Sequence, residues 1–538
     1  MLTYPYASSV NLGIAMLHQW GVLAVVILGF ASGAHAQAPS DTSKQCAAVA
    51  GTDFSRVMDA PTQITSSKNV AATTDLPAFC QVQGYVAPAV GFELRLPMSD
   101  WNGKFFKVGC GGFCGAVFTA ACNAPLKKGY ACIASDMGHK STALDAKWGY
   151  NNTQTEIDFG YRATHVSAVA GKAITQQFYS KAPTRSYYAG CSTGGRQGLV
   201  EAQRFPYDFD GIIAGAPVIN ETGAGMQLLW NVVVNRDKSG KQILGPDEAR
   251  MVNAAVVNKC DMQDNVEDGI IGDPRTCKFD PAGLQCRGSQ TANCLTPEQV
   301  SVVRKIYAGP KNSQGLALYT GGALPGSEMN WIDNYISRDG AESTYWKFMG
   351  DLFRYIGFMP DPGPDWQPTQ FDFDRDYKRL GMMETMYSGS NPDLRKFKYN
   401  GGKIIAYQGW ADQSVVPLNV IDYYELTERT MGGRAATQDF FRLFMVPGMN
   451  HCRGGVGADA IDYLGHLEAW VEQGKAPDMV LATRLKDEAA AKYLPTGYSF
   501  PLAASEVEFT RPVYPYPAAY RYNGSSDAKD AASFKMTK

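Results

Sequence analysis

The pentapeptide Gly-Cys-Ser-Thr-Gly at residues 190–194 constrains the fold of this chain more than any other segment. A strand-like apolar run at 186–189 precedes it, a helical pattern follows to about residue 204, and a second strand-like run returns at 211–215. A strand–helix–strand order of this kind indicates a parallel sheet. The small flanking residues permit a sharp turn that lifts the serine hydroxyl above the sheet. We therefore predict an α/β fold with Ser192 at the end of a central strand.

A serine hydroxyl is a weak nucleophile without a base, and in this fold the base is a histidine that follows a later strand. Two histidines lie downstream of Ser192. His451 follows a strand-like run at 441–446 and a Pro-Gly turn, whereas His466 falls in a predicted amphipathic helix at 461–473. We predict His451 as the base, with a purely structural loop histidine as the alternative.

The acid of such a triad follows the strand before the one that carries the base. A strand-like run at 403–408 leads through Gly-Trp-Ala to Asp412. Asp422, the competing carboxylate, falls in a helix that begins near residue 417. We predict that Asp412 holds the His451 imidazole in the correct tautomer and stabilises the imidazolium that forms.

Two cysteines sit beside two members of this predicted triad. Cys191 directly precedes Ser192, and Cys452 directly follows His451. If the serine and the histidine are hydrogen-bonded, their chain neighbours come within disulfide range. The loop-entropy estimate for closing so long a loop is about 5–6 kcal/mol, as an upper bound. The coincidence is an internal check on the choice of nucleophile and base.

An oxyanion hole needs two backbone N–H groups, one of them from the residue after the nucleophile. That residue is Thr193. The glycine-dense segment at 109–112 follows an apolar run and is the expected source of the second donor. We predict Gly111 for this role, with Gly112 as the next choice and a plain tight turn as the alternative.

The length of 538 residues exceeds the size at which a single core stops growing, about 250–300 residues, so an insertion or a second domain is expected. From about residue 217 to 400 the strand rhythm is lost, which indicates an inserted lid. The predicted organisation is a signal peptide at 1–36, the first part of the α/β core at 37–216, the lid at 217–400, the second part of the core at 401–522 and a disordered polar tail at 523–538.

The amino-terminal segment predicts export. An apolar run at 21–30, too short to span a bilayer, precedes an Ala-His-Ala sequence that fits cleavage after Ala36. No Lys or Arg precedes this run, so Met16 is an alternative start. No later segment has 18 consecutive apolar residues, so we expect a secreted or periplasmic protein without a membrane span.

Charge and cysteine content narrow the function classes. The chain has 50 Lys and Arg residues against 52 Asp and Glu residues. This balance shows no excess of positive charge of the kind that binds nucleic acid or an anionic membrane. Twelve cysteines in an exported chain predict up to six disulfides. A zinc site is the alternative. Cys110 and Cys114 are spaced closely enough to be two ligands, but no second close pair of cysteines with a histidine follows them.

Carboxylates crowd one stretch of the predicted lid. Asp261, Asp264 and Asp268 lie so close in sequence that they repel one another unless a cation neutralises them. With backbone carbonyls from Val266 and Ile270, they could wrap a hard cation such as calcium. From the spacing alone, a solvated acidic loop is an equal alternative.

Several segments together resemble the tannase and feruloyl esterase family. They are GCSTGGRQG at the serine, GWADQSVVP at the predicted acid, PGMNHC at the predicted base, and WNGKFFKVGCGG, SDMGHKS and FDGIIAGAP elsewhere. The resemblance runs from about residue 101 to 452. It implies an α/β-hydrolase core with a large lid, a Ser192–Asp412–His451 triad and the hydrolysis of small aromatic esters, with no protein partner.

The resemblance also implies a structural calcium ion and a set of disulfides. The ion would be held by Asp261, Asp264, Asp268 and the carbonyls of Val266 and Ile270. The disulfides would be Cys191–Cys452, Cys260–Cys277, Cys286–Cys294 and Cys46–Cys80. It implies no pairing for Cys110, Cys114, Cys122 and Cys132, and a cysteine inside the predicted oxyanion segment departs from the family pattern.

Substrate choice is expected in the lid, whose aromatic side chains could sandwich a flat acyl ring or form lid core. They include Trp331, Trp346, Phe348, Phe353, Tyr355, Phe358 and Trp366. Arg338 or Arg354 could meet the second carboxylate of a terephthalate monoester. The terephthalate branch of the family carries Glu where this chain has Thr193, so we predict feruloyl or galloyl esters and keep terephthalate monoesters as the alternative.

Other protein classes fit the sequence less well. A non-catalytic phenolic- or carbohydrate-binding descendant would have lost a triad member, and all three are present. A peptidase or a lipase would share the serine turn and the triad, but neither is expected to carry the Cys-Ser and His-Cys pairs together.

Overall fold

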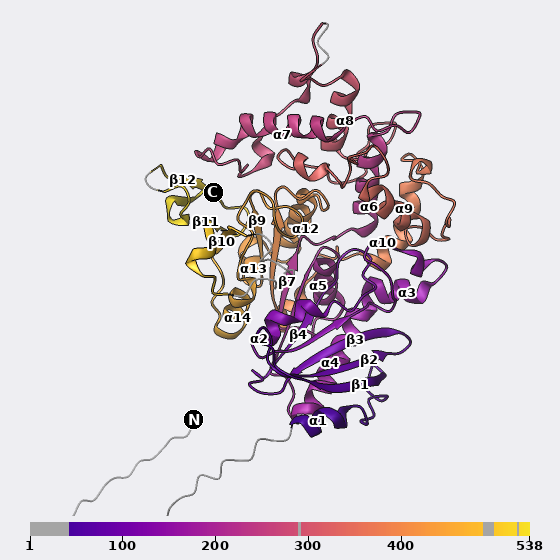
Figure 1. Ribbon diagram of the computed structural model, residues 1–538, viewed down its shortest axis with the longest axis vertical. Helices are drawn as coiled ribbons and strands as arrows, with labels where there is room; N and C mark the ends of the chain where they lie inside the picture. The colour runs from indigo at the N-terminus through magenta and orange to yellow at the C-terminus, as the bar shows by residue number, and fades with distance from the viewer. Residues whose placement is uncertain (1–41, 289–291, 488–499, 525–526, 538) are drawn as a thin grey trace, which may run out of the picture. The chain divides into compact units, whose positions relative to one another are not determined.

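The computed structural model describes residues 42–288, 292–487, 500–524 and 527–537 (Figure 1). The predicted signal peptide at 1–36 lies outside these residues. The core is built on a nine-stranded mixed sheet with the order β1-β2-β3-β5-β4-β6-β7-β8-β9. The described residues contain no helix that is both long and apolar enough to cross a membrane.

The sheet has an antiparallel part and a parallel part. The antiparallel strands are β1 (Thr62–Val70), β2 (Phe79–Val86) and β3 (Val90–Pro97), and β3 joins β5 in antiparallel register. The parallel strands are β4 (Lys104–Val108), β5 (Ala131–Ser135), β6 (Arg185–Cys191), β7 (Gly211–Gly215), β8 (Lys403–Gly409) and β9 (Phe441–Val446). Their carboxyl ends therefore meet at one edge, where ligand sites of such sheets form.

Both faces of the parallel strands are buried under helices, which explains their continuous apolar runs. Along β6, Tyr188 points into one core cluster with Leu199 of α5 (Thr193–Arg204). Its neighbour Tyr187 points into the opposite cluster with Leu467 of α14 (Tyr463–Gln473). On the first face α5 is joined by α4 (Ala163–Tyr179) and α12 (Pro417–Thr430). This doubly covered sheet is the predicted α/β core.

The helical segment at 153–179 forms from three consecutive pieces. They are α3 (Thr153–Ile157), a π-helical turn η3 (Asp158–Arg162) and α4. Shorter elements complete the core: α1 (Thr42–Val49), η1 (Thr119–Cys122), α2 (Asn123–Lys127), η2 (Lys147–Gly149) and α13 (Arg434–Gln438).

A long insertion separates the adjacent parallel strands β7 and β8, and the segment predicted as a lid, 217–400, falls within it. Its helices are α6 (Glu221–Val234), α7 (Pro246–Cys260), α8 (Pro297–Ala308), α9 (Thr344–Tyr355), α10 (Gly381–Tyr387) and α11 (Arg395–Tyr399). Helix α6 lies beside α8, α9 and α10 (Figure 1). The insertion reaches the core where α9 meets η2 and α10 meets η3.

The carboxyl-terminal segment carries two small sheets. Strand β10 (Val480–Leu485) pairs with β11 (Val507–Val513), and β12 (Ala519–Tyr522) pairs with β13 (Phe534–Thr537). The prediction of a disordered tail at 523–538 is therefore wrong for β13. The reason is the one aromatic side chain of this segment: Phe534 is buried with Tyr520 and Val266, and the Arg511 guanidinium lies 4.3 Å from its ring centroid.

Candidate active site

Ser192 occupies the sharp turn between β6 and α5. Its backbone angles are φ 64° and ψ −125°, a conformation that non-glycine residues rarely adopt. The turn is held because Ser192 N–H donates to the Gly215 carbonyl at 3.0 Å and Arg196 N–H donates to the Ser192 carbonyl at 3.0 Å. A Cβ on Gly190 would lie 2.6 Å from the backbone of Gly194, so this turn requires small neighbours. The serine side chain remains partly exposed above the sheet.

Asp412 lies in the loop after β8, here named the acid loop (residues 410–416), and is 1% exposed. Its Oδ1 accepts hydrogen bonds from the N–H groups of Ser414 at 2.7 Å and Val415 at 2.9 Å. Its Oδ2 accepts from Gln408 Nε2 at 2.8 Å and from His451 Nδ1 at 2.9 Å. Four donors thus compensate the burial of this carboxylate.

His451 lies in the loop after β9, here named the base loop (residues 447–455), and is partly exposed. Because its Nδ1–H faces Asp412, its Nε2 is left as the proton acceptor. The two loops are held together by backbone bonds, since Ala411 N–H donates to the Met449 carbonyl at 3.0 Å. His466 lies in α14, where burial lowers its pKa, and Asp422 lies on α12, bonded to the Thr320 hydroxyl. Among the described residues, neither of these two competing side chains is hydrogen-bonded to Asp412 or His451.

A disulfide joins Cys191, at the end of β6, to Cys452 in the base loop, with a Cα–Cα distance of 6.0 Å. It brings together residues separated by 261 positions, one beside Ser192 and the other beside His451. All twelve cysteines are paired, which leaves none for zinc. The other bonds are Cys46–Cys80, Cys260–Cys277 and Cys286–Cys294, as the resemblance implied, and two for which it implied no pairing, Cys110–Cys114 and Cys122–Cys132.

The glycine-rich loop (residues 109–115) follows β4 and lies beside the serine turn because β4 and β6 are neighbours in the sheet. Thr193 Oγ1 donates to the Gly112 carbonyl at 2.8 Å, which ties the loop to the first turn of α5. Among the described residues, the N–H groups of Gly111 and Thr193 have no acceptor. A Cβ on Gly111 would meet nothing within 4 Å, so this residue borders open space. The two predicted oxyanion donors are therefore adjacent and unengaged.

The insertion contributes contacts to both loops that the sequence did not reveal. Asn330 Nδ2 donates to Asn450 Oδ1 in the base loop at 2.6 Å and to the Ala411 carbonyl in the acid loop at 3.2 Å. One amide thus bridges the residues next to Asp412 and His451. No local pattern in the sequence distinguishes this asparagine from the others of the insertion.

Two tyrosines of the insertion reach the acid loop directly. The Tyr335 hydroxyl donates to the Gln413 carbonyl, and the Tyr345 hydroxyl is hydrogen-bonded to the Ser414 hydroxyl. Both tyrosines are buried, so these bonds are shielded from water. The geometry of the acid loop therefore depends on the insertion as well as on the core.

Of the seven aromatic side chains considered as substrate contacts, three are almost fully buried and one meets the glycine-rich loop. Trp331, Phe353 and Phe358 are at most 1% exposed and form the interior of the insertion. Phe348 is only partly buried, and its ring centroid lies 4.5 Å from that of Phe113 in the glycine-rich loop. Phe348 is thus placed at the boundary between insertion and site.

The two arginines considered for a substrate carboxylate are engaged elsewhere. Arg338 forms two hydrogen bonds of 2.8 Å with Asp333 on the exposed surface. Arg354 donates to the Trp366 carbonyl at 2.6 Å and pairs with Asp351 at 3.3 Å. Neither guanidinium is therefore free to bind a second carboxylate.

The predicted calcium ligands lie in the loop after α7. Asp261 is 6% exposed and accepts from the N–H of Gly269 at 3.0 Å, whereas Asp268 Oδ2 pairs with Arg511 at 2.6 Å. Asp264 Oδ2 is buried and has no partner in the described part of the chain. Burial, and next the nearby Asp268, raise the pKa of Asp264 to about 7. A buried, unpartnered carboxylate oxygen among other oxygen donors fits a hard cation.

The three carboxylates of this loop are not drawn together tightly. Within the described residues, the group of three acidic or histidine side chains whose ligand atoms lie within 4.8 Å of one another is elsewhere, at His165, Glu201 and Asp208. One of the three carboxylates, that of Asp268, is paired with Arg511 of β11.

The strand order and the site together define an α/β hydrolase. Parallel strands at one edge of the sheet are followed by the serine turn, the acid loop, the base loop and the glycine-rich loop. The family described as tannase and feruloyl esterase matches residues 71–537. The chain belongs to this family and is a carboxylic ester hydrolase, so a non-catalytic binding protein is excluded.

Curated relatives and solved structures agree with this placement. Mono(2-hydroxyethyl) terephthalate hydrolase from Piscinibacter sakaiensis is 33% identical over 534 residues, covering 86% of this chain and 85% of the relative. Probable feruloyl esterase B-2 from Aspergillus flavus is 33% identical over 454 residues, covering 78% and 82%. The crystal structure of feruloyl esterase B from Aspergillus oryzae superposes with a TM-score of 0.80 at 26% identity, covering 92% of this chain and all of that one.

Proposed function

We propose that this enzyme hydrolyses esters of aromatic carboxylic acids, feruloyl or galloyl esters foremost, through an acyl-enzyme on Ser192. The observation that carries the proposal is the Asp412–His451 hydrogen bond, held next to a serine on a strained turn by the Cys191–Cys452 disulfide. These are the parts that activate a hydroxyl as a nucleophile at neutral pH.

In the acylation step, His451 Nε2 takes the proton of the Ser192 hydroxyl as its oxygen attacks the ester carbonyl carbon. Asp412 stabilises the imidazolium that results. The negative charge on the carbonyl oxygen is met by the N–H groups of Thr193 and Gly111. When the tetrahedral intermediate collapses, His451 gives its proton to the leaving alcohol oxygen, and the acyl group stays on Ser192.

In the deacylation step, water replaces the alcohol. His451 removes a proton from the water as its oxygen attacks the acyl carbon, and the same two N–H groups hold the oxyanion. The serine leaves with the proton returned by His451. The products are the aromatic acid and the free enzyme.

Two observations favour a neutral aromatic acyl group. The Phe348 ring meets Phe113 of the glycine-rich loop, so a flat acyl ring that enters beside this loop would lie next to an aromatic side chain. Arg338 and Arg354 are both occupied by other partners, so neither supplies a cation for the second carboxylate of a terephthalate monoester. Terephthalate monoesters remain the second candidate because a relative named for that activity is 33% identical.

The proposal is tested by turnover of methyl ferulate, methyl gallate and a terephthalate monoester by the purified mature protein. Ser192→Ala is expected to lose at least about 10³-fold in kcat, whereas Ser239→Ala, an exposed serine of the insertion, should match wild type. Substantial turnover by Ser192→Ala would overturn the nucleophile assignment. Methyl butyrate is assayed beside them, and an active wild type that prefers this aliphatic ester would overturn the aromatic acyl assignment.

We also propose that Asp261, Asp264, Asp268 and the carbonyls of Val266 and Ile270 hold a structural calcium ion. The buried, unpartnered Asp264 Oδ2 supports this assignment. The ion would neutralise the carboxylates and stabilise the insertion, and no step of the reaction runs through it. Arg511 already neutralises part of Asp268, so the ion would have to share that carboxylate.

Export is proposed on two grounds. The apolar run at 21–30 and the Ala-His-Ala sequence fit a cleaved signal peptide, and six disulfides are typical of an oxidising compartment. Amino-terminal sequencing of the protein recovered outside the cytoplasm should begin at residue 37. An uncleaved amino terminus in that fraction would contradict the proposal.

A further inference from the structure

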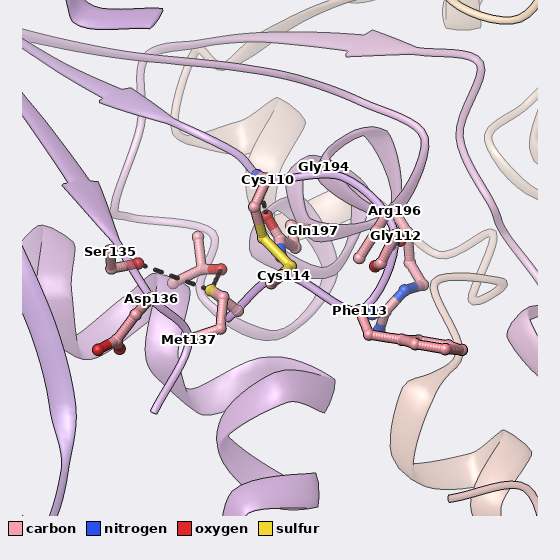
Figure 2. The surroundings of a disulfide bond; sticks show 12 residues. Cys110, Gly112, Phe113, Cys114, Ser135, Asp136, Met137, Gly194, Arg196 and Gln197 are labelled. Atoms are coloured by element: carbon pink, nitrogen blue, oxygen red, sulfur yellow. Dashed lines mark hydrogen bonds between the residues drawn. A yellow bond between two sulfur atoms is a disulfide. The ribbon is translucent and has the colours of Figure 1, made fainter. Parts of the chain in front are cut away.

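The glycine-rich loop contains a disulfide, between Cys110 and Cys114, for which neither the triad nor the resemblance accounts (Figure 2). The ring that it closes contains Gly111, the proposed oxyanion donor. We propose that this disulfide and Gln197 form a positioning device that fixes the Gly111 N–H toward the reacting carbonyl oxygen. The inference rests on the proposed function, because that N–H has this role only if Ser192 carries out acyl transfer.

Gln197 connects the disulfide to the helix that begins at the serine turn. It lies one turn beyond Thr193 in α5 and is 2% exposed. Its Nε2 lies 3.1 Å from Cys110 Sγ and 3.7 Å from Cys114 Sγ. Its Oε1 accepts from the Cys110 N–H at 3.4 Å. Both ends of this buried amide thus contact the disulfide-bonded ring (Figure 2), and Oε1 also accepts from the Tyr188 hydroxyl at 3.0 Å.

The backbone of the ring is fixed on its other side by the core. Phe113 N–H donates to the Ala143 carbonyl at 2.8 Å, and the Phe113 carbonyl is bonded to His139 Nε2 at 2.8 Å. Burial lowers the pKa of His139 to about 4, so its imidazole is neutral at working pH and donates this bond. The backbone N–H and carbonyl of Phe113 are thus hydrogen-bonded, whereas the Gly111 N–H has no acceptor in the described part of the chain.

The conformation of this loop needs a restraint. Gly112 and Cys114 both have left-handed backbones, with φ of 56° and 63°, and two glycines in succession give the segment much freedom when it is not tied. An oxyanion donor is effective only if it is held in place before the charge develops. The Cys110–Cys114 bond joins the two ends of the segment and removes that freedom.

A purely stabilising role fits less well than a positioning role. With a sequence separation of 4, the bond closes the shortest ring of the six disulfides, so it restricts the unfolded chain least. Its contacts instead run to Gln197 and, through Thr193 Oγ1 and the Gly112 carbonyl, to the residue after the nucleophile. Loss of the bond should therefore affect turnover more than stability.

The test compares Cys110→Ala/Cys114→Ala and Gln197→Met with wild type and with Cys286→Ala/Cys294→Ala. The control removes another short ring, of separation 8, within the insertion. We expect the Cys110/Cys114 variant to lose about 10- to 100-fold in kcat, as for a misplaced oxyanion donor, with KM within about twofold. Gln197→Met, which keeps the disulfide, should lose about 3- to 10-fold in kcat in the same way.

A second readout separates positioning from general damage. Benzeneboronic acid forms a tetrahedral adduct with an active-site serine and places an oxygen in the oxyanion hole. Its inhibition constant should rise by the same factor as kcat falls, while inhibition by the product acid, which makes no such adduct, should stay within about twofold. The thermal midpoint of the Cys110/Cys114 variant should fall no further than that of the control.

Unchanged kcat and boronate inhibition in both test variants of an active enzyme would overturn this inference and leave the proposed function intact. A rise in KM at constant kcat would also overturn it, since uniform binding would then be the property lost. If the double cysteine variant does not fold, Gln197→Met decides the question alone. A wild-type protein with no turnover of any ester would remove the proposed function and this inference with it.

Discussion

His451 Nδ1 and Asp412 Oδ2 lie 2.9 Å apart, although the two residues are 39 positions apart in the chain and belong to loops after different strands. Asp412 is 1% exposed and is held by three further donors, so its orientation is fixed before substrate binds. The orientation of the imidazole is therefore set by a buried carboxylate of the core, and its Nε2 is left as the proton acceptor.

Replacing Asp412 by Asn should lower kcat by about 10³- to 10⁴-fold while KM changes little, because the amide can stabilise the wrong imidazole tautomer. Steady-state kinetics with methyl ferulate measure this. Asp422→Asn is the matched control: Asp422 lies on α12, away from His451, and its variant should keep wild-type turnover. The reverse result, with Asp422→Asn inactive and Asp412→Asn active, would exchange the two roles.

Removing the disulfide beside the triad should destabilise the protein strongly. Cys191→Ala/Cys452→Ala opens a loop of 261 positions, for which a loss of about 2–5 kcal/mol in the free energy of unfolding is expected. Cys286→Ala/Cys294→Ala, with a separation of 8, should lose less. Denaturant unfolding under non-reducing conditions gives both values. Equal losses would mean that the long bond does not restrict the unfolded chain.

Glu156 makes stability depend on pH. This carboxyl group is 1% exposed in α3, and burial, followed by the charge of Asp361, raises its pKa from 4.5 to about 8. The folded state therefore binds the proton more tightly than the unfolded chain. Stability from this group is fully present below about pH 4.5 and is lost as pH rises to about 8, with a slope of up to ~1.4 kcal/mol per pH unit.

Glu156→Gln should remove this loss. Its thermal midpoint should equal that of wild type near pH 4.5 and exceed it at pH 8, as calorimetry across that range will show. Other buried carboxyl groups also titrate there, among them Asp136 and Glu384, whose pKa values are raised by burial to about 6 and about 7. The difference between variant and wild type isolates Glu156, and a constant difference at all pH values would contradict the assignment.

Calcium should stabilise the protein through Asp264. At a calcium concentration of 100 times the dissociation constant, the free energy of unfolding should rise by about 2.7 kcal/mol. Asp264→Asn should abolish the response, and Glu267→Gln should retain it, because Glu267 is an exposed carboxylate of the same loop outside the proposed ligand set. Thermal midpoints with calcium and with a chelator measure the effect. An identical response in all three proteins would place the ion elsewhere.

Phe348 is expected to select aromatic acyl groups. Phe348→Ala removes the ring that meets Phe113, so KM for methyl ferulate should rise about 5- to 20-fold. Turnover of an aliphatic ester such as methyl butyrate should change little, since such an ester has no ring to contact. Equal effects on both esters would show that Phe348 supports the fold of the site and not its selectivity.

The strands of the core and the loops that follow them could be predicted from the sequence, because each depends on residues that are neighbours in the chain. Continuous apolar runs of strand length predicted β6, β7, β8 and β9, and the positions of Ser192, Asp412 and His451 follow from which residue ends each run. The Cys-Ser and His-Cys pairs indicated that two of these loops meet, because a disulfide requires its cysteines to be close in space.

Other features depend on contacts between segments that are distant in the chain. The spacing of apolar residues along the sequence does not predict such contacts. The bridging bonds of Asn330, the tyrosine contacts on the acid loop and the Cys110–Cys114 ring with Gln197 arise only when the insertion and the sheet pack together. Phe534 shows the same limit, since one buried ring orders a tail whose composition predicts disorder. Local residue patterns thus determined the strands and the candidate site residues of this esterase, whereas long-range packing decided which neighbours hold those residues in position.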